Sequence, residues 1–171
     1  MLDPLDQRAR SIEVPGISRF MDHDGNRAQF VPSLIHYGTD STPVVGAGVL
    51  TKRLLHDPST IRWMKTTLVE GLVDTPHQVR TDRVVTRKQA ASEFLNNVLR
   101  SAISNPSESD TACFTVPVNS FEDYGQWLES MARSAGFSNV KFIDEASAAA
   151  AGYEAGLKPG DVLDSARHAL D

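Results

Sequence analysis

Residues 111–156, TACFTVPVNSFEDYGQWLESMARSAGFSNVKFIDEASAAAAGYEAG, decide the expected fold. The apolar run at 111–116 predicts a buried strand, and the run at 140–143 predicts a second strand. Between them, apolar residues recur at helical spacing over 121–136, and an alanine-rich helix follows the second strand. Strand, helix, strand and helix with short connections form a βαβα unit, in which the two strands should be parallel neighbours.

Capping patterns support the helices. A further amphipathic helix is expected upstream, in TRKQAASEFLNNVLRSAIS, where Thr86 and Gln89 form a capping-box pattern. Ser120 and Asp123 form a similar pattern before the helix of the βαβα unit, and Gly136 should end that helix. The upstream helix carries its apolar residues on one face, namely Ala91, Phe94, Leu95, Val98 and Ala102.

The first part of the chain, up to about Gly48, is typical of short antiparallel strands. An Asp-Gly turn at 24–25 separates two apolar runs, and GTDST at 38–42 predicts a second turn. Helical turns are expected in VLTKRLL, ending before the Asp-Pro at 57–58, whereas 71–85 reads as a loop leading into a strand. We expect an α/β fold with one mixed sheet, in which this antiparallel meander joins the two parallel strands.

Length and charge limit the class of protein. The 171 residues, 40% of them hydrophobic, are enough to bury the core of one domain. A net charge of −5 without a Lys/Arg cluster argues against nucleic acid or a membrane surface as a partner. The amino terminus, MLDPLDQRAR, has no apolar signal region, and no stretch has the length of a membrane span. We therefore expect a cytoplasmic protein.

The single cysteine, Cys113, lies in an apolar run and leaves no intrachain disulfide to form. We expect it to be buried and to have no catalytic role. The five histidines are far apart, and none pairs with a cysteine or carboxylate at metal-ligand spacing. The sequence therefore predicts no structural metal.

Asp144 and Glu145 stand side by side between the second strand and the alanine-rich helix. Two interpretations remain open. Carboxylates at a helix N-terminus are favoured by the helix dipole, so the pair could simply cap the helix. Alternatively, ligands of open α/β sheets bind beyond the carboxyl ends of the strands, where both carboxylates and Pro117 stand. A carboxylate there could orient water or a hydrated Mg²⁺ beside a phosphate.

The order of these segments resembles the nucleotide-binding domain of DnaK-type heat-shock chaperones, the heat shock protein 70 family. Residues 111–153 carry the strongest likeness: a TVP strand, an amphipathic helix ending in Arg-x-Ala-Gly, a short strand, an acidic residue and an alanine-rich helix. The spacing from Pro117 to Glu145 matches the family pattern without a gap. FVPSLIHYGTDSTPVVGAGV and DPSTIRWMKTTL also resemble family segments, so the likeness covers roughly 19–153.

This resemblance implies an actin-like ATPase (ribonuclease H-like) fold. The chain would be a partial lobe I at 19–160, with a peripheral subdomain at approximately 50–105. Residues 1–18 would form an N-terminal segment, expected to be poorly ordered, and 161–171 a C-terminal tail.

The resemblance also implies a site for ATP or ADP with Mg²⁺. Lys65 stands where the family has its catalytic lysine, which helps position the attacking water and stabilises charge on the γ-phosphate. Lys52, in LTKRLL, is the competing candidate, because its local context is also family-like. Glu145 matches the acidic residue near the hydrated Mg²⁺ and would act through metal-bound water, not as a direct ligand. Pro117 matches the proline that relays nucleotide state to the substrate-binding domain.

The sequence departs from the family at several points. Gly125 occupies the position of an arginine that works with the relay proline, and the family's Glu-Pro-Thr reads Glu-Ala-Ser at 145–147. The chain is shorter between Lys65 and Pro117, which implies a trimmed peripheral subdomain. Neither Gly-rich phosphate loop of the family is present, and such loops supply the N–H groups that hold phosphates. We therefore expect this chain alone to be inactive and to bind no cofactor tightly.

Two functions remain open. The chain could be a fragment of a DnaK-type molecular chaperone-like ATPase, whose partners are the second lobe, a substrate-binding domain and co-chaperones. Alternatively, it could be a non-enzymatic interaction or scaffold module built on a divergent actin-like lobe. In either case a sheet that lacks strands leaves an exposed edge or apolar surface, through which a homodimer could form.

Overall fold

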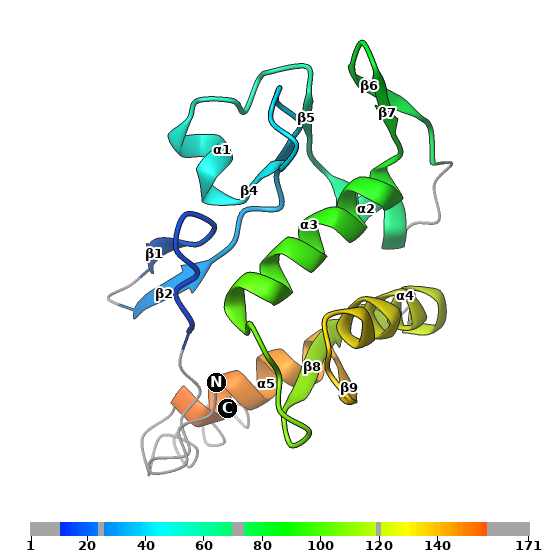
Figure 1. Cartoon of the computed structure of the whole chain (residues 1–171). Helices are drawn as coiled ribbons and strands as arrows, with labels where there is room; N and C mark the ends of the chain where they lie inside the picture. The colour runs from blue at the N-terminus through cyan, green and yellow to red at the C-terminus, as the bar shows by residue number, and fades with distance from the viewer. Residues whose placement is uncertain (1–10, 24–25, 70–73, 119–120, 157–171) are drawn as a thin grey trace, which may run out of the picture.

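The protein is a mixed α/β chain with several small sheets and five helices in its described parts (Figure 1). The expected Asp-Gly turn at 24–25, the cap residue Ser120 and the tail at 161–171 lie outside the described residues. The computed structural model describes residues 11–23, 26–69, 74–118 and 121–156.

Short antiparallel strands make up the first part of the chain, as predicted. The strands are β1 (Arg19–His23), β2 (Asn26–Phe30), β3 (Ile35–His36), β4 (Val44–Val45) and β5 (Thr60–Ile61). β1 pairs with β2, and β3 pairs with both β4 and β5, all in antiparallel register. The inner residues of the β4–β3–β5 sheet are buried and begin the larger hydrophobic core cluster.

Two short helices accompany these strands. α1 (Ala47–Thr51) ends at Thr51 with Lys52 as its C-cap, earlier than the Asp-Pro stop that the sequence suggests. α2 (Met64–Val69) follows β5, and the sequence does not predict it, because six residues are too few to show a helical period. Met64 and Thr67 are buried and fix the inner face of α2 against the core.

A β-hairpin stands where the sequence predicts a loop leading into one strand. β6 (His77–Arg80) pairs with β7 (Arg83–Val85) in antiparallel register. The guanidinium group of Arg80 donates to Asp82 at 2.9 Å and to the carbonyl oxygen of Gly38 at 2.8 Å. These bonds hold the turn of the hairpin against the segment between β3 and β4.

α3 (Arg87–Ala102) begins with the predicted capping box. The Gln89 N–H donates to Thr86 Oγ1 at 3.2 Å, and the Thr86 N–H donates to Gln89 Oε1 at 2.8 Å. Both bonds satisfy backbone donors that the helix leaves unpaired at its start. Ala90 and Ala91 are buried in the larger core cluster, so the first turns of α3 lie close to the surrounding strands.

The βαβα unit is confirmed. It consists of β8 (Thr111–Val116), α4 (Phe121–Ser134), β9 (Asn139–Asp144) and α5 (Glu145–Gly156). β8 and β9 are parallel neighbours and stay in register along their whole length.

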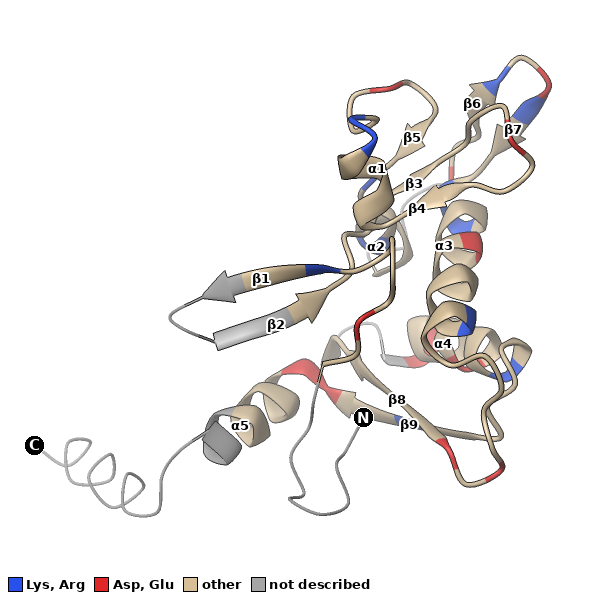
Figure 2. Cartoon of the chain, turned by 60° about the vertical axis from the view of Figure 1, so that its left-hand side comes forward, with Lys and Arg blue, Asp and Glu red and all other residues tan. Residues whose placement is uncertain are grey.

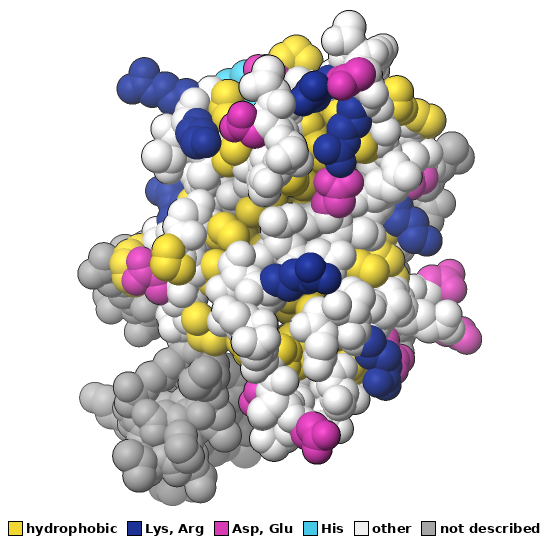
Figure 3. All heavy atoms as spheres, viewed as in Figure 1, with side chains coloured by type: hydrophobic (Ala, Val, Ile, Leu, Met, Phe, Trp, Pro, Cys, Tyr) yellow, Lys and Arg dark blue, Asp and Glu magenta, His cyan; other side chains and the backbone are white. Residues whose placement is uncertain are grey.

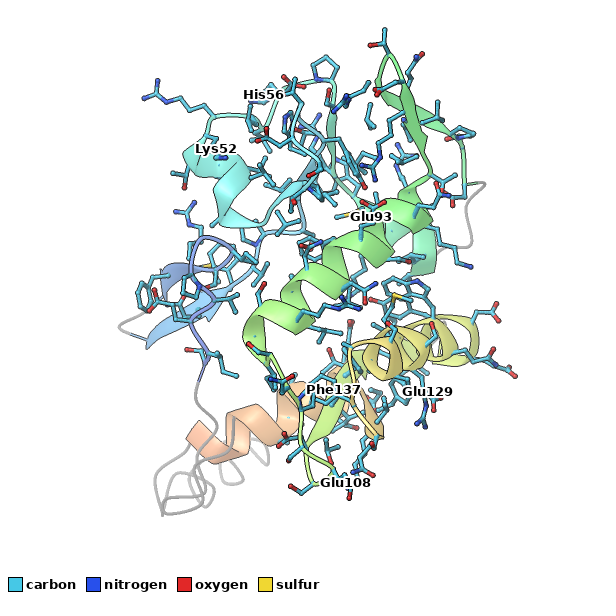
Figure 4. The ribbon with its side chains drawn as sticks, viewed as in Figure 1. Lys52, His56, Glu93, Glu108, Glu129 and Phe137 are labelled. Carbon is cyan, nitrogen blue, oxygen red and sulfur yellow. The ribbon has the colours of Figure 1, made fainter. Side chains whose placement is uncertain are left out.

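The prediction of one mixed sheet is wrong. In the described parts of the chain, β8 and β9 form a two-stranded sheet of their own, separate from the antiparallel strands. α3 lies between the two groups (Figure 1), because its first half packs in the larger core cluster and its end packs on a smaller one. A helix with side chains is about 10 Å across, whereas paired strands lie about 4.8 Å apart, so strands on opposite sides of α3 cannot pair. The smaller cluster is built on Ala112, Ala132 and Phe137, the last of which is labelled in Figure 4.

The predictions of a fully buried β8 and a buried Cys113 are also wrong. Burial alternates along β8: Ala112 and Val116 are buried, whereas Thr111, Cys113 and Thr115 are exposed. Side chains of a strand point alternately to the two faces of its sheet. α4 packs on the face that carries Ala112, so the other face, with the cysteine, stays accessible.

Charges of both signs are interspersed on the face shown in Figure 3, and no basic stripe crosses that face. Within the ranges given above, the helices are too short or too polar to cross a membrane.

α4 ends in a Schellman motif that requires a residue with positive φ. Gly136 has φ +100°, its N–H donates to the Arg133 carbonyl at 3.0 Å, and the Phe137 N–H donates to the Ala132 carbonyl at 3.1 Å. The predicted stop at this glycine is therefore confirmed.

Replacing Gly136 by alanine should lower the free energy of unfolding by about 1–2 kcal/mol, because a Cβ is strained at positive φ. The matched control is Gly125→Ala inside α4, where an added Cβ meets nothing within 4 Å. That variant should raise stability by about 0.5–1 kcal/mol, since alanine is the better helix former. Urea unfolding measures both changes, and equal signs for the two variants would contradict this account.

Candidate functional site

β8 and β9 end at the same edge of their sheet. Val116 pairs with Asp144 in the last step of the register, so Pro117 and Glu145 leave the sheet side by side. Pro117 is half-buried there. Figure 2 shows the acidic residues at the junction of β9 and α5. This is the edge at which ligands bind in open α/β sheets.

The two neighbouring carboxylates have different partners. Asp144 Oδ1 accepts a hydrogen bond of 2.8 Å from the Ser147 N–H, three residues into α5. Hydrogen bonding from Ser147 lowers the pKa of Asp144 below its usual value. The capping interpretation is therefore confirmed for Asp144. Glu145 lies in the first turn of α5, where the helix dipole favours a carboxylate, but its side chain has a further partner.

Glu145 instead contacts Lys65. Lys65 Nζ lies 2.6 Å from Glu145 Oε1, although the two residues are 80 positions apart in the sequence. Lys65 is the second residue of α2, and Glu145 is the first residue of α5. Their side chains are 55% and 45% exposed, so the pair is accessible to a ligand from solvent.

The competing lysine lies elsewhere. Lys52 stands at the end of α1, far from α5 in Figure 4, and its side chain is exposed. Its backbone N–H donates to the Gly48 carbonyl at 3.0 Å, as expected for the end of a helix. Among the described residues, Lys65 is thus the lysine that pairs with Glu145.

Tyr124 of α4 lies beside this pair. Burial raises the pKa of Tyr124, the Lys65 ammonium opposes this rise, and the Glu145 carboxylate adds to it. The Tyr124 ring stacks on Trp127 with centroids 5.7 Å apart. The sequence places Tyr124 on the apolar face of α4, and no sequence signal brings it to the Lys65–Glu145 pair.

A cavity of about 370 Å³ adjoins Lys65. It lies between α2, α3, α4 and β8, and most of its wall is apolar. Its polar lining residues include Ser33, Lys65, Cys113, Thr115 and Tyr124. The cavity thus extends from Lys65 to the middle of β8.

In the described ranges, no three His, Cys, Asp or Glu side chains come together as a metal-binding group. Neither the models of known protein families nor the sequences of curated proteins match this chain. The likeness to DnaK-type chaperones therefore stays a prediction, and function has to be argued from the geometry of the site.

The cap at Asp144 should make the free energy of unfolding depend on pH in the acidic range. Its pKa in the folded chain lies below the unfolded value of about 4, so its contribution is complete above that pH and is lost as pH falls through the folded pKa. Asp144→Asn keeps a cap acceptor but removes the charge. Below about pH 4, the stability of this variant should fall less steeply than that of the unaltered chain.

Urea unfolding across this pH range measures the effect. The control is Asp123→Asn, which alters an exposed aspartate in the first turn of α4. An acid limb left unchanged by Asp144→Asn, or flattened equally by both variants, would show that the cap does not behave as described.

The ion pair should give a small but measurable coupling. In a double-mutant cycle, Lys65→Ala and Glu145→Ala should show an interaction of roughly 0.2–1 kcal/mol, the range of exposed ion pairs. The coupling should shrink as salt is added, because exposed charges are screened. The matched cycle of Lys52→Ala with Glu145→Ala should be additive. Coupling to Lys52 and none to Lys65 at low salt would refute the observed pairing.

Proposed function

We propose that this chain contributes Lys65 and Glu145 to the nucleotide site of a DnaK-type chaperone-like ATPase. The observation that supports the proposal is the 2.6 Å contact between Lys65 Nζ and Glu145 Oε1. The resemblance to the family predicts a catalytic lysine at Lys65 and an acidic residue at Glu145. An ion pair with this exposure contributes little to stability, so the fold gains little from bringing the two side chains together.

The chemistry of the pair suits phosphoryl transfer, which depends on positioning and on electrostatic stabilisation of the phosphate oxygens. A lysine ammonium is a compact charge on a flexible side chain, so it can move to contact a phosphate oxygen. The ion pair with Glu145 holds the Lys65 ammonium at the sheet edge. The phenol of the neighbouring Tyr124 is protonated at neutral pH and can act as a hydrogen-bond donor, and burial raises its pKa further.

The residues also fit the manner in which Mg²⁺ would be held. Mg²⁺ keeps several of its waters and takes few protein ligands. Asp144 is engaged in capping α5, which leaves Glu145 as the carboxylate at this edge that can face a metal-bound water. When bound, the ion would neutralise phosphate charge, while Lys65 and Glu145 orient the phosphate and the water beside it.

A cradle for the phosphates is not part of the sequence. The 171 residues contain neither Gly-rich loop of the family, and without such loops few backbone N–H groups converge on a phosphate. The partners under this proposal are the second lobe and substrate-binding domain of a chaperone, and its co-chaperones. We place its action in the cytoplasm.

Titration calorimetry of this chain with Mg-ATP should therefore give no saturable heat below about millimolar nucleotide, since a lysine and a glutamate without a cradle attract ATP only weakly. In the full gene product, Lys65→Ala should slow ATP hydrolysis about 100-fold, the effect of removing one transition-state donor. Lys52→Ala is the control and should leave the rate nearly unchanged. If Lys52→Ala slowed hydrolysis more than Lys65→Ala, the catalytic lysine would be Lys52, and the role proposed for Lys65 would be wrong.

The two-stranded β8–β9 sheet favours the alternative, a non-enzymatic interaction module. Parallel sheets are normally covered on both faces, yet Cys113 and Thr115 are exposed on one face of this sheet. A second copy of the chain or another partner could cover that face or extend the sheet edge. If neither Lys65→Ala nor Glu145→Ala changed the rate of ATP hydrolysis by the full gene product, the interaction module would be favoured over the ATPase.

A further inference from the structure

A second site is formed where β5 leads into α2. α2, the β6–β7 hairpin and the start of α3 lie together on one side of the molecule (Figure 1). Between them is a hollow of about 190 Å³. Its walls include Pro58, Ile61, Arg62, Trp63, His77 and Arg87. It shares no lining residue with the cavity beside Lys65, so the two sites are separate.

Trp63 has an unfavourable backbone conformation, and burial of its side chain does not compensate for it. Its φ is +61°, a value that costs free energy for a bulky residue with a Cβ. Its side chain is 73% exposed, so little burial offsets that cost. Strained residues of this kind concentrate at functional sites, where the surrounding structure maintains them. Trp63 therefore points to a function for this surface.

The cations of this site are also placed against local preference. Arg87 is the first residue of α3, where the helix dipole disfavours positive charge, and the first turn contains no acidic residue. Arg62 is exposed. In the described parts of the chain, neither arginine makes a side-chain hydrogen bond or an ion pair, whereas Arg80 and Arg133 pair with carboxylates. Two uncompensated guanidinium groups on a chain of net charge −5 mark a place for an external anion.

We propose that Arg62, Trp63, His77 and Arg87 form a docking site for an acidic segment of a partner protein. The hollow is smaller than the roughly 300 Å³ at which small-molecule sites begin, and it suits one inserted side chain. The planar fork of arginine matches a carboxylate. Tryptophan and arginine are the residues that most often dominate protein–protein binding, and Trp63 supplies the apolar anchor.

His77 forms one wall of the hollow. Its Nε2 atom is buried and finds no hydrogen-bond partner in the described chain. Leaving a buried polar atom unpaired costs free energy. His77 is therefore destabilising in this position, as Trp63 is. This inference does not depend on the proposed ATPase, because it uses none of the residues of that site.

Fluorescence anisotropy can test the proposal with a labelled peptide in which glutamates flank a leucine. The comparison peptide has glutamine in place of every glutamate. The acidic peptide should bind the whole chain, the glutamine peptide should bind far more weakly, and added salt should weaken the acidic complex. Equal binding of the two peptides, or binding of neither, would overturn the proposal.

Variants locate the binding surface. Trp63→Ala should weaken acidic-peptide binding about 30-fold, as for a residue that dominates an interface, and Arg62→Ala or Arg87→Ala about fivefold. Arg100→Ala is the matched control, because it removes the same charge from the other end of α3, on the order of 20 Å away. It should leave binding unchanged. If Arg100→Ala weakened binding as much as Arg87→Ala, the peptide would be responding to the overall charge of the chain, which would contradict a defined site.

Trp63→Gly separates function from stability. Glycine tolerates positive φ, so this variant should melt at or above the temperature of Trp63→Ala while it binds the peptide equally poorly. A lower melting temperature for Trp63→Gly than for Trp63→Ala would mean that the left-handed conformation is not maintained, and the proposal would lose its main observation. Dimerisation that Trp63→Ala abolishes would assign the site to a second copy of this chain instead of an acidic partner.

Discussion

The packing of α3 against two hydrophobic clusters is the constraint on which the rest of the structure depends. The start of α3 is buried among the β4–β3–β5 sheet, the β6–β7 hairpin and α2, and its end packs on the smaller cluster under β8 and β9. Trp127 of α4 adds a hydrogen bond of 3.0 Å to Ser92 Oγ on α3. This one helix therefore sets how α2 lies relative to the βαβα unit. The contact between Lys65 and Glu145 follows from that placement.

Fold features that depend on a few neighbouring residues could be predicted from the sequence. The capping box at Thr86 and the helix stop at Gly136 each need only local hydrogen bonds, and both are present. The parallel pairing of β8 and β9 follows from the short connections on either side of α4. The division into separate sheets could not be predicted, because it depends on which elements α3 keeps apart. The exposure of Cys113 is a consequence of that division, since an apolar run looks the same in a half-covered strand and in a buried one.

The candidate site shows a similar division. The capping role of Asp144 is a local prediction with a local outcome. The pairing of Lys65 with Glu145 joins distant segments, and only the family likeness named both residues in advance. Tyr124 and Trp63 could not be predicted as functional. The first looks like any core residue on a helix face, and no sequence signal marks a tryptophan that will adopt positive φ.

The contact between Lys65 and Glu145 can be measured most directly by carbodiimide cross-linking followed by mass spectrometry of the digested protein. The reagent joins a lysine ammonium to a carboxylate as an amide, with loss of water, only when the two groups touch. The structure predicts a cross-linked peptide that contains Lys65 and Glu145 in the folded chain and its loss in denaturant. A cross-link of Glu145 to Lys52 in its place, or no cross-link to Glu145 in the folded chain, would contradict the arrangement of α2 and α5 described here.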